Sequence, residues 1–238
     1  MSSGASFERA LRDRQAEDYD DWYRRTKGAG FDRREREIFR DRARGASRAL
    51  DLGAGTGRIT EALGGVPHVV AVDFSGGSLR ALAQKSLPHA TPVLADAAAI
   101  PIRSGSCDLV VSCQVLTLLR PLQVAAALHE AARVLRPGGR LVASFYNRDY
   151  WRDRSGPEPV DASDHLYLRR FSTDEVAEVA GPAGFRAVRS DVYKALPDRG
   201  HVPASLTALY AVMDRVICRA FGRRAGCYVL YEGIRGAR

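Results

Sequence analysis

The sequence predicts an α/β fold, doubly wound, in which an open and mostly parallel β-sheet carries helices on both faces. From residue 49 onward, short apolar runs alternate with helix-like segments, as they do when crossover helices join parallel strands. Several of these runs are unbroken Val, Leu and Ala, which is typical of strands covered on both faces. With 238 residues and 45% of them hydrophobic, the chain can bury one sizeable core and is not intrinsically disordered.

The N-terminal segment, residues 1–48, has a different character, because nearly half of its side chains are charged. Asp32 and Glu35 fit a capping box, which predicts a helix from Asp32 to residue 44, and residues 19–25 predict an earlier helix. The many charged residues predict that these helices are too polar to belong to the hydrophobic core. We therefore expect residues 1–48 to form an N-terminal helical appendage resting on the rest of the chain.

One aromatic face is expected in this appendage, from Tyr19, Trp22 and Tyr23 at the helical spacing i, i+3 and i+4. Charged residues flank it in the sequence, so the face needs a surface to cover. We interpret the appendage as a lid that closes over a ligand site and excludes water. The alternative is that the three rings only anchor the segment to the sheet domain.

Residues 49–238 are expected to form one domain built on a seven-stranded sheet. The strand candidates are residues 49–52, 68–73, 92–95, 108–113, 140–146, 185–194 and 227–234. Helices are expected at residues 58–63, 78–85 and 122–135, and a capping box at Ser172 and Glu175 begins another that ends near residue 181.

A further amphipathic helix is expected near residues 206–220. Its apolar stripe consists of Leu206, Leu209, Tyr210, Met213, Val216, Ile217 and Ala220. We expect this stripe to pack on the protein's own sheet. A membrane-surface helix and a dimer helix are the alternatives.

Composition restricts the partners and the compartment. The net charge is +8, but nearly all of the basic residues are Arg, which indicates a compositional bias, and the excess is spread out except over the last two dozen residues. A nucleic-acid partner is therefore not expected. No stretch approaches the ~20 apolar residues of a membrane span, the N-terminus resembles no secretory signal, and the four cysteines form no Cys-x-x-Cys pair. We expect a soluble cytoplasmic protein without a membrane partner.

A glycine-rich turn follows the first predicted strand, in the sequence Ala-Leu-Asp-Leu-Gly-Ala-Gly-Thr-Gly at residues 49–57. Glycine lets a ligand approach the backbone, and the helix that follows favours anionic groups at its N-terminus. Asp73 ends the next predicted strand, where a carboxylate can accept from both hydroxyls of a ribose; the alternative is that it only caps a helix. Arg58 stands where a dinucleotide fingerprint has its third glycine, which favours a ligand without a pyrophosphate.

In these motifs the chain resembles the class I S-adenosylmethionine (SAM)-dependent methyltransferases. Five segments match that family in order, at residues 50–57, 69–75, 94–101, 107–112 and 135–141. The resemblance implies a Rossmann-like fold, SAM as cofactor and S-adenosyl-L-homocysteine as product. The cofactor-binding residues that it implies are Tyr19, Asp51, Gly53, Ala54, Gly55, Gly57, Asp73, Phe74, Asp96, Ala97 and Cys113.

Several types of methyl acceptor and of catalytic mechanism are excluded by residues that the chain lacks. After the fourth strand the chain reads Ser-Cys-Gln-Val at residues 112–115, without the Asn/Asp-Pro-Pro-aromatic motif of family members that methylate amino groups of adenine or glutamine. Cys113 also lacks the neighbours of a nucleophilic cysteine, and no carboxylate cluster suggests a metal. His165 is a candidate general base, and Tyr146 and Asn147 lie where open sheets bind ligands; for all three the alternative is a structural role.

These observations predict methyl transfer to an oxygen or nitrogen of a small-molecule metabolite, in secondary metabolism, by a monomer or homodimer without a metal. Positioning of the acceptor would supply most of the catalysis. Two alternatives remain open at this point. One is an RNA base methyltransferase that uses the basic surface, and the other is a non-catalytic SAM-binding regulatory protein.

Overall fold

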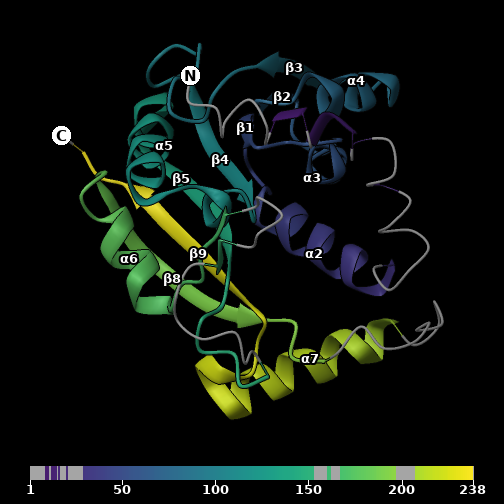
Figure 1. The fold of residues 1–238 in the computed structure, drawn as a ribbon, viewed down its shortest axis with the longest axis vertical. Coiled ribbons are helices and arrows are strands. Elements are labelled where there is room, and N and C mark those ends of the chain that lie inside the picture. The colour runs from purple at the N-terminus through teal and green to yellow at the C-terminus, as the bar shows by residue number, and fades with distance from the viewer. Residues whose placement is uncertain are drawn as a thin grey trace.

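The computed structural model describes residues 9–10, 12–14, 16, 20, 29–152, 160–161, 167–196 and 207–237. Its main feature is a seven-stranded sheet with the order β3-β2-β1-β4-β5-β9-β8 (Figure 1). The strands are β1 Arg48–Leu52, β2 His68–Asp73, β3 Ala90–Leu94, β4 Cys107–Cys113, β5 Leu135–Tyr146, β8 Phe185–Tyr193 and β9 Tyr228–Arg235. The helices are α2 Ala29–Arg42, α3 Arg58–Ala62, α4 Gly76–Gln84, α5 Pro121–Val134, α6 Thr173–Ala180 and α7 Thr207–Phe221.

The sheet is mostly parallel, as predicted. Strands β1 to β5 all run parallel to one another, and β9 pairs antiparallel with both β5 and β8. Tyr228, which begins β9, pairs with Tyr146 at the end of β5 and with Tyr193 at the end of β8. The carboxyl ends of β1, β2, β4, β5 and β8 therefore meet at one edge of the sheet, here called the carboxyl edge.

Helices cover both faces of the sheet, which confirms the doubly wound architecture. Helices α5 and α6 pack on one face, and α2, α3 and α4 pack on the other (Figure 1). The helix predicted at residues 122–135 corresponds to α5, and its apolar stripe is buried, with Val124, Leu128 and Ala131 at most 2% exposed. The capping box at the start of α6 is also present, since Ser172 accepts from the Glu175 N–H and Glu175 accepts from the Ser172 N–H.

Four further short elements lie in the described part of the chain. Strands β6 Val160–Asp161 and β7 Tyr167–Leu168 form a small antiparallel sheet. The 3₁₀ turns are η1 Leu116–Leu118 after β4 and η3 Gly222–Arg224 after α7. Within the described residues no helix is long and apolar enough to cross a membrane.

Helix α2 corrects two predictions. It begins at Ala29, so Asp32 lies inside the helix and caps nothing; its carboxylate, like that of Glu35, is used in tertiary contacts instead. The helix is also not too polar for the core. Phe39 is fully buried and Ile38 is 9% exposed, both in a cluster with residues of β1, β4 and α3. Charged residues on the other faces of α2 conceal this narrow apolar strip in the composition.

Helix α7 corrects a third prediction. Only part of the predicted apolar stripe packs inward: Tyr210 and Ile217 are half-buried, and Ile217 belongs to a small cluster with Val192 of β8. Of the other members, Leu209, Met213 and Val216 are 47–58% exposed. The buried side of the helix carries Ala211, Cys218 and Asp214 instead. The pattern identified an amphipathic helix correctly but assigned the wrong side to the interior. Residue 206 lies outside the described residues.

Candidate active site at the carboxyl edge

The glycine-rich turn leaves β1 at the carboxyl edge, and its three glycines serve different purposes. Gly53, Gly55 and Gly57 all have positive φ, at 77°, 55° and 86°, a conformation that L side chains rarely adopt. A Cβ at Gly53 would overlap the side chain of Val115, and one at Gly57 would come within 2.7 Å of Leu82. A Cβ at Gly55 would meet nothing within 4 Å. Packing therefore explains Gly53 and Gly57, whereas Gly55 lies beside open space.

The carboxylate of Asp73 helps to shape this turn. One of its oxygens accepts from the Gly55 N–H at 2.8 Å, and the other accepts from the Ser75 N–H at 2.8 Å. Burial raises the pKa of Asp73, and the two N–H donors oppose that shift. A carboxylate oxygen can accept more than one hydrogen bond, so Asp73 can also take donors from a ligand.

Asp51 lies beneath the turn and is 1% exposed. It accepts a hydrogen bond from the Thr60 hydroxyl at 2.6 Å. Burial raises the pKa of Asp51 to about 6, and the nearby negative charge of Asp73 adds to that shift. Two carboxylates thus lie close together under the turn, which favours a cationic ligand above it.

The next strand end brings Asp96 to the same edge. The Ala95 N–H donates to the Asp73 carbonyl at 3.0 Å, so the segment after β3 lies against the end of β2. Asp96 is exposed, and one of its oxygens accepts from the Ala98 N–H at 2.9 Å. The remaining predicted positions here are Ala54, which is buried, and Phe74 and Ala97, which are half-buried.

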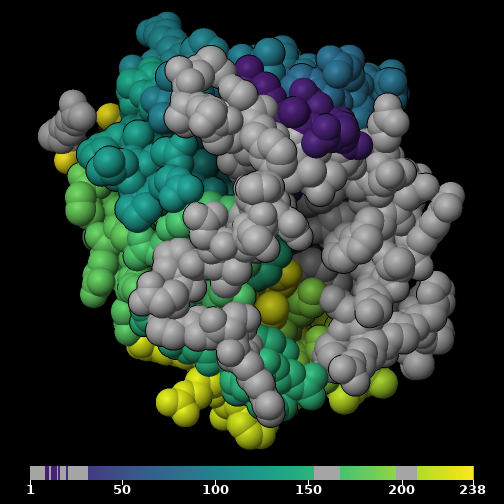
Figure 2. All heavy atoms as spheres, in the orientation of Figure 1, coloured from purple at the N-terminus to yellow at the C-terminus, as the bar shows by residue number. Residues whose placement is uncertain are grey.

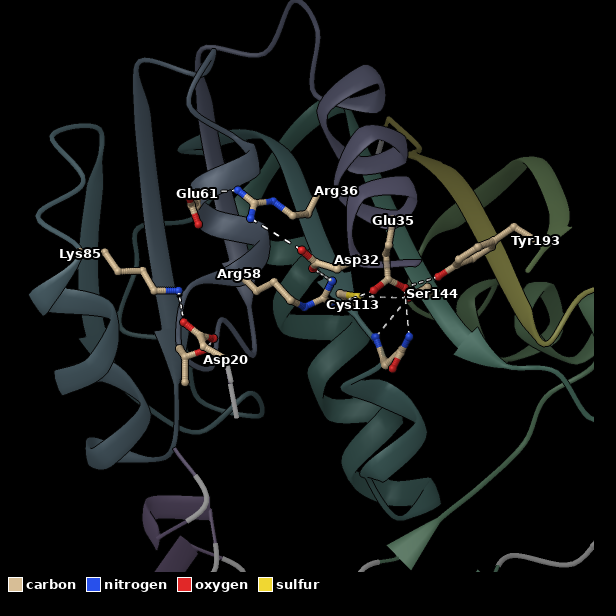
Figure 3. A network of polar contacts seen from close by, with 12 residues as sticks. Asp20, Asp32, Glu35, Arg36, Arg58, Glu61, Lys85, Cys113, Ser144 and Tyr193 are labelled. Atoms are coloured by element: carbon tan, nitrogen blue, oxygen red, sulfur yellow. Dashed lines mark hydrogen bonds and ion pairs between the residues drawn. The ribbon is translucent and has the colours of Figure 1, made fainter. Parts of the chain in front are cut away.

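A buried polar network lies on the other side of the turn, and sequence reasoning missed most of it (Figure 3). Glu35, which is fully buried on α2, accepts from Arg58 at 2.6 Å, from Tyr193 at 2.6 Å and from the Gln114 side chain at 3.0 Å. Arg58 also donates to Asp32 at 2.9 Å. The network therefore joins α2 and β8 to the first helix turn after the glycines.

Two members of this network lie at the end of β4, Cys113 as its last residue and Gln114 directly after it. Gln114 has φ 60°, an uncommon conformation for a residue with a side chain, and its N–H donates to the Ser144 carbonyl and hydroxyl. The Cys113 sulfur lies 3.3 Å from an Arg58 nitrogen. Burial raises the pKa of the Cys113 thiol well above its usual range, with the charge of Glu35 adding to the effect, so it stays protonated at neutral pH.

The sequence singled out two members of this network, Arg58 as the residue that replaces a third glycine and Cys113 as a cofactor-binding position implied by the resemblance. Asp32 and Glu35 were visible only as a possible capping box. Gln114 and Tyr193 carried no signal, because their partners lie 79 and 158 residues away along the chain.

Of the residues predicted to lie near the methyl acceptor, the structure describes Tyr146 and Asn147. Tyr146 ends β5 half-buried, with its ring centroid 4.9 Å from that of Tyr228, which in turn stacks on Tyr193 at 5.3 Å. Asn147 has a structural role: its buried amide donates to the carbonyls of Arg223 and Gly226, at 2.7 Å each. His165 and Tyr19 lie outside the described residues, as do Trp22 and Tyr23.

The N-terminal segment reaches the site through two described carboxylates. Asp13 accepts from the Ser75 hydroxyl at 2.6 Å and from the Gly77 N–H at 2.8 Å, at the start of α4. Asp20 accepts from the hydroxyl of Thr56, inside the glycine-rich turn, at 2.6 Å. In Figure 2 the described N-terminal residues, in purple, lie against the blue surface of α4 and β3. Among all described residues, no group of three His, Cys, Asp or Glu side chains could hold a metal ion.

Comparison with known proteins agrees with this geometry. Residues 50–143 match a family model described as a methyltransferase domain. A demethylmenaquinone methyltransferase of Beutenbergia cavernae is 38% identical over 133 residues, which cover 55% of this chain and 51% of that protein. A malonyl-[acyl-carrier protein] O-methyltransferase of Methylococcus capsulatus is 36% identical over 158 residues, covering 61% and 54%. The chain thus spans about half the length of the curated relatives it matches.

Among solved structures, the 1,6-didemethyltoxoflavin-N1-methyltransferase of Burkholderia thailandensis superimposes with a TM-score of 0.67. The match covers 100% of this chain and 92% of that one, at 18% identity. That structure contains 1,6-didemethyltoxoflavin and S-adenosylhomocysteine. At this identity the likeness establishes the fold.

Proposed function

We propose that the chain is a class I SAM-dependent methyltransferase, an enzyme that methylates an oxygen or nitrogen of a small-molecule metabolite. The match of residues 50–143 to a family model described as a methyltransferase domain supports this proposal. The observation that carries this proposal is the open space beside Gly55, bordered by the carboxylate of Asp73 at the carboxyl edge. Open parallel sheets bind their ligands at this edge. We further propose that the enzyme acts in the cytoplasm, in secondary metabolism.

The residues of the site fit SAM. Gly55 has a positive φ and open space, so a ligand can lie against the backbone there without displacing a side chain. Asp51 and Asp73 place negative charge beneath that space, which suits a ligand with a sulfonium and an ammonium group. SAM supplies a methyl group on a positively charged sulfur. When a nucleophile attacks the methyl carbon in line, the carbon–sulfur bond breaks and the sulfur leaves readily as a neutral thioether.

The protein's own groups would bind the two ends of the nucleoside. Each oxygen of Asp73 can accept a further hydrogen bond beside its backbone donor, which suits two ribose hydroxyls. Asp96 is exposed at the neighbouring strand end, with one oxygen held by Ala98, so its other oxygen is suited to accept from the adenine amino group. The family resemblance assigns both roles in the same way.

Catalysis then depends on alignment of the acceptor. Holding the nucleophilic atom in line with the methyl group and excluding water supplies much of the acceleration. Tyr146 ends β5 at the carboxyl edge, where its hydroxyl is suited to orient an acceptor, and His165 remains our candidate base. A thiolate nucleophile at Cys113 is disfavoured, since burial keeps that thiol protonated.

We propose that, of residues 1–48, the part that precedes α2 acts as a lid on this site. Asp13 and Asp20 support the proposal, because they bind the first turn of α4 and the glycine-rich turn, which border the cofactor space. Lys85 adds an ion pair to Asp20 at 2.6 Å. A segment attached at these two points is suited to retain the cofactor and to exclude water.

The proposal is tested by calorimetric titration of S-adenosylhomocysteine in the presence of a chelator. We expect Asp73→Asn to weaken binding about 10- to 100-fold, corresponding to loss of a charged hydrogen-bond acceptor worth about 1.5–3 kcal/mol. The control is Glu178→Gln, at an exposed position on α6, which should bind as the wild type does. Equal affinity in Asp73→Asn, or no binding by the wild type, contradicts the proposal.

The lid is tested on the same ligand by stopped flow. Asp20→Ala removes the contact with Thr56, so S-adenosylhomocysteine should dissociate about tenfold faster, the scale of one charged hydrogen bond. An unchanged dissociation rate contradicts the lid while leaving the cofactor assignment intact.

A further inference from the structure

Helix α7 presents an unusual apolar surface to solvent. Its outward side, here called the α7 stripe, consists of Leu209, Val212, Met213 and Val216, which are 47–58% exposed. Phe221 extends the stripe at the end of the helix and is 73% exposed. Contiguous exposed apolar side chains of this size generally mark a surface that binds something.

The orientation of α7 is held by its buried side. Asp214 is 1% exposed and accepts hydrogen bonds from the N–H groups of Lys194, Ala195 and Leu196, at 3.1, 2.6 and 3.4 Å. Rotating the helix to bury the α7 stripe would leave this carboxylate and the three backbone N–H groups without their hydrogen-bond partners. The stripe therefore faces outward because the inward face is specified by a polar anchor.

Arginines border the α7 stripe. Arg215 and Arg219 lie along one side of the helix, and Arg224 follows in η3; all three are exposed. Arg223, next to Arg224, is exposed too, but it forms an ion pair with Asp174 of α6. Asp214 is the one carboxylate in the sequence from residue 207 to residue 224, and it is buried. The outward side of this segment thus combines apolar side chains with positive charge.

An exposed tryptophan lies next to the same end of α7. Trp151 is 61% exposed, and its backbone N–H donates to the Arg224 carbonyl at 3.0 Å. The guanidinium of Arg152 lies 4.5 Å from the Trp151 ring centroid. Tryptophan is enriched where proteins meet the headgroup region of a bilayer, because its ring is apolar and its N–H is polar.

We propose that the α7 stripe, with Phe221 and Trp151, docks the protein on the surface of an anionic lipid bilayer. A basic amphipathic helix with large apolar side chains on its free face is suited to lie in the headgroup plane, and each nearby arginine is attracted to anionic lipids. A second copy of the chain fits less well. A two-fold interface on this stripe would bring the arginines of both copies together.

This docking surface adjoins the candidate site. Helix α7 lies between the end of β8 and the start of β9, on the side of the carboxyl edge, at the bottom of Figure 1. Docking through α7 would bring the edge that carries Tyr146 close to the lipid. The inference concerns where the protein acts, so it stands independently of which atom is methylated.

The experiment is co-sedimentation of the full chain with two kinds of vesicle, one of phosphatidylcholine alone and one of phosphatidylcholine mixed with phosphatidylglycerol. We expect binding to the anionic vesicles at least tenfold tighter than to the neutral ones, and weaker in high salt. Val216→Glu should reduce binding at least about tenfold through loss of apolar insertion, and Arg219→Gln about fivefold through loss of one charge.

The matched control is Leu122→Glu, which introduces the same charge at a leucine that is 87% exposed on α5, away from α7. It should bind vesicles as the wild type does, and Val216→Glu should retain the wild-type thermal unfolding because its site is exposed. Failure of the wild type to bind anionic vesicles, or equal losses in Leu122→Glu and Val216→Glu, overturns the proposal. So does sedimentation velocity showing that Val216→Glu converts a dimer to a monomer, because the stripe then binds a second copy.

Discussion

Helices α2 and α7 show opposite relations between composition and burial. Helix α2 is rich in charge, yet it buries Phe39 in the core between the sheet and α3. Helix α7 is rich in apolar residues, yet it exposes Leu209, Val216 and other large side chains. In both helices a buried carboxylate lies on the inward face: Glu35 in α2 and Asp214 in α7.

The two carboxylates differ in what they bind. Glu35 accepts from three side chains, one of them the guanidinium of Arg58, whereas Asp214 accepts from three backbone N–H groups. The comparison indicates that a satisfied polar anchor can decide which side of a helix faces inward, against the average hydrophobicity of the helix.

The largest expected effect is at Glu35. Glu35→Ala removes the partner of Arg58, whose side chain is 10% exposed, and leaves the Tyr193 hydroxyl and the Gln114 amide without this acceptor. Breaking a buried ion pair of this kind costs about 3–5 kcal/mol, which we expect in the free energy of unfolding measured in urea. Glu37→Gln, which breaks the exposed pair with Arg33, should cost less than about 1 kcal/mol. Similar losses in the two variants would show that Glu35 is not an anchor.

Two phenylalanines test the comparison directly. Phe39→Ala in charged α2 should lower the free energy of unfolding by about 3–5 kcal/mol, because it opens a cavity at a fully buried site. Phe221→Ala at the end of apolar α7 should change it by no more than about 0.5 kcal/mol, since that ring is 73% exposed. If the order of the two losses were reversed, composition would be the better guide to burial in this protein.

A third buried carboxylate, Asp51, shows how the hydrogen-bond partner affects the protonation of a buried carboxyl group. It gives the smallest expected effect on the free energy of unfolding. Asp51 binds the neutral Thr60 hydroxyl, and burial raises its pKa to about 6. A carboxyl whose pKa is higher in the folded state stabilises the fold at low pH, and this contribution is lost as the pH rises through that value. For a shift to about 6, the loss between pH 5 and pH 8 is about 1.4 kcal/mol.

Asp51→Asn lacks that titration. Its free energy of unfolding, relative to the wild type, should therefore improve by about 1.4 kcal/mol from pH 5 to pH 8 in paired urea titrations. A pH-independent difference would mean that Asp51 does not carry its proton into the neutral range. Asp51 would then resemble Glu35 and Asp214, whose carboxylates accept several hydrogen bonds.

The amino-acid sequence alone determined the sheet, its seven strands and the position of the glycine-rich turn, because short-range patterns encode them. Apolar runs, turn residues and spacing identify strands wherever both faces are covered. The same local patterns located Asp51, Asp73 and Asp96 at strand ends, and their proximity followed from the parallel topology.

Only the tertiary structure decided which sides of α2 and α7 face inward and which residues complete the network around Glu35. Gln114 and Tyr193 reach Glu35 from 79 and 158 residues away, and no local pattern reports a hydrogen bond across that separation. The different uses of Gly53, Gly55 and Gly57 were likewise decided by Val115 and Leu82, which fill the space beside two of them. Burial depends on which partners the fold brings together, and a satisfied polar group can outweigh the hydrophobic pattern of its own helix.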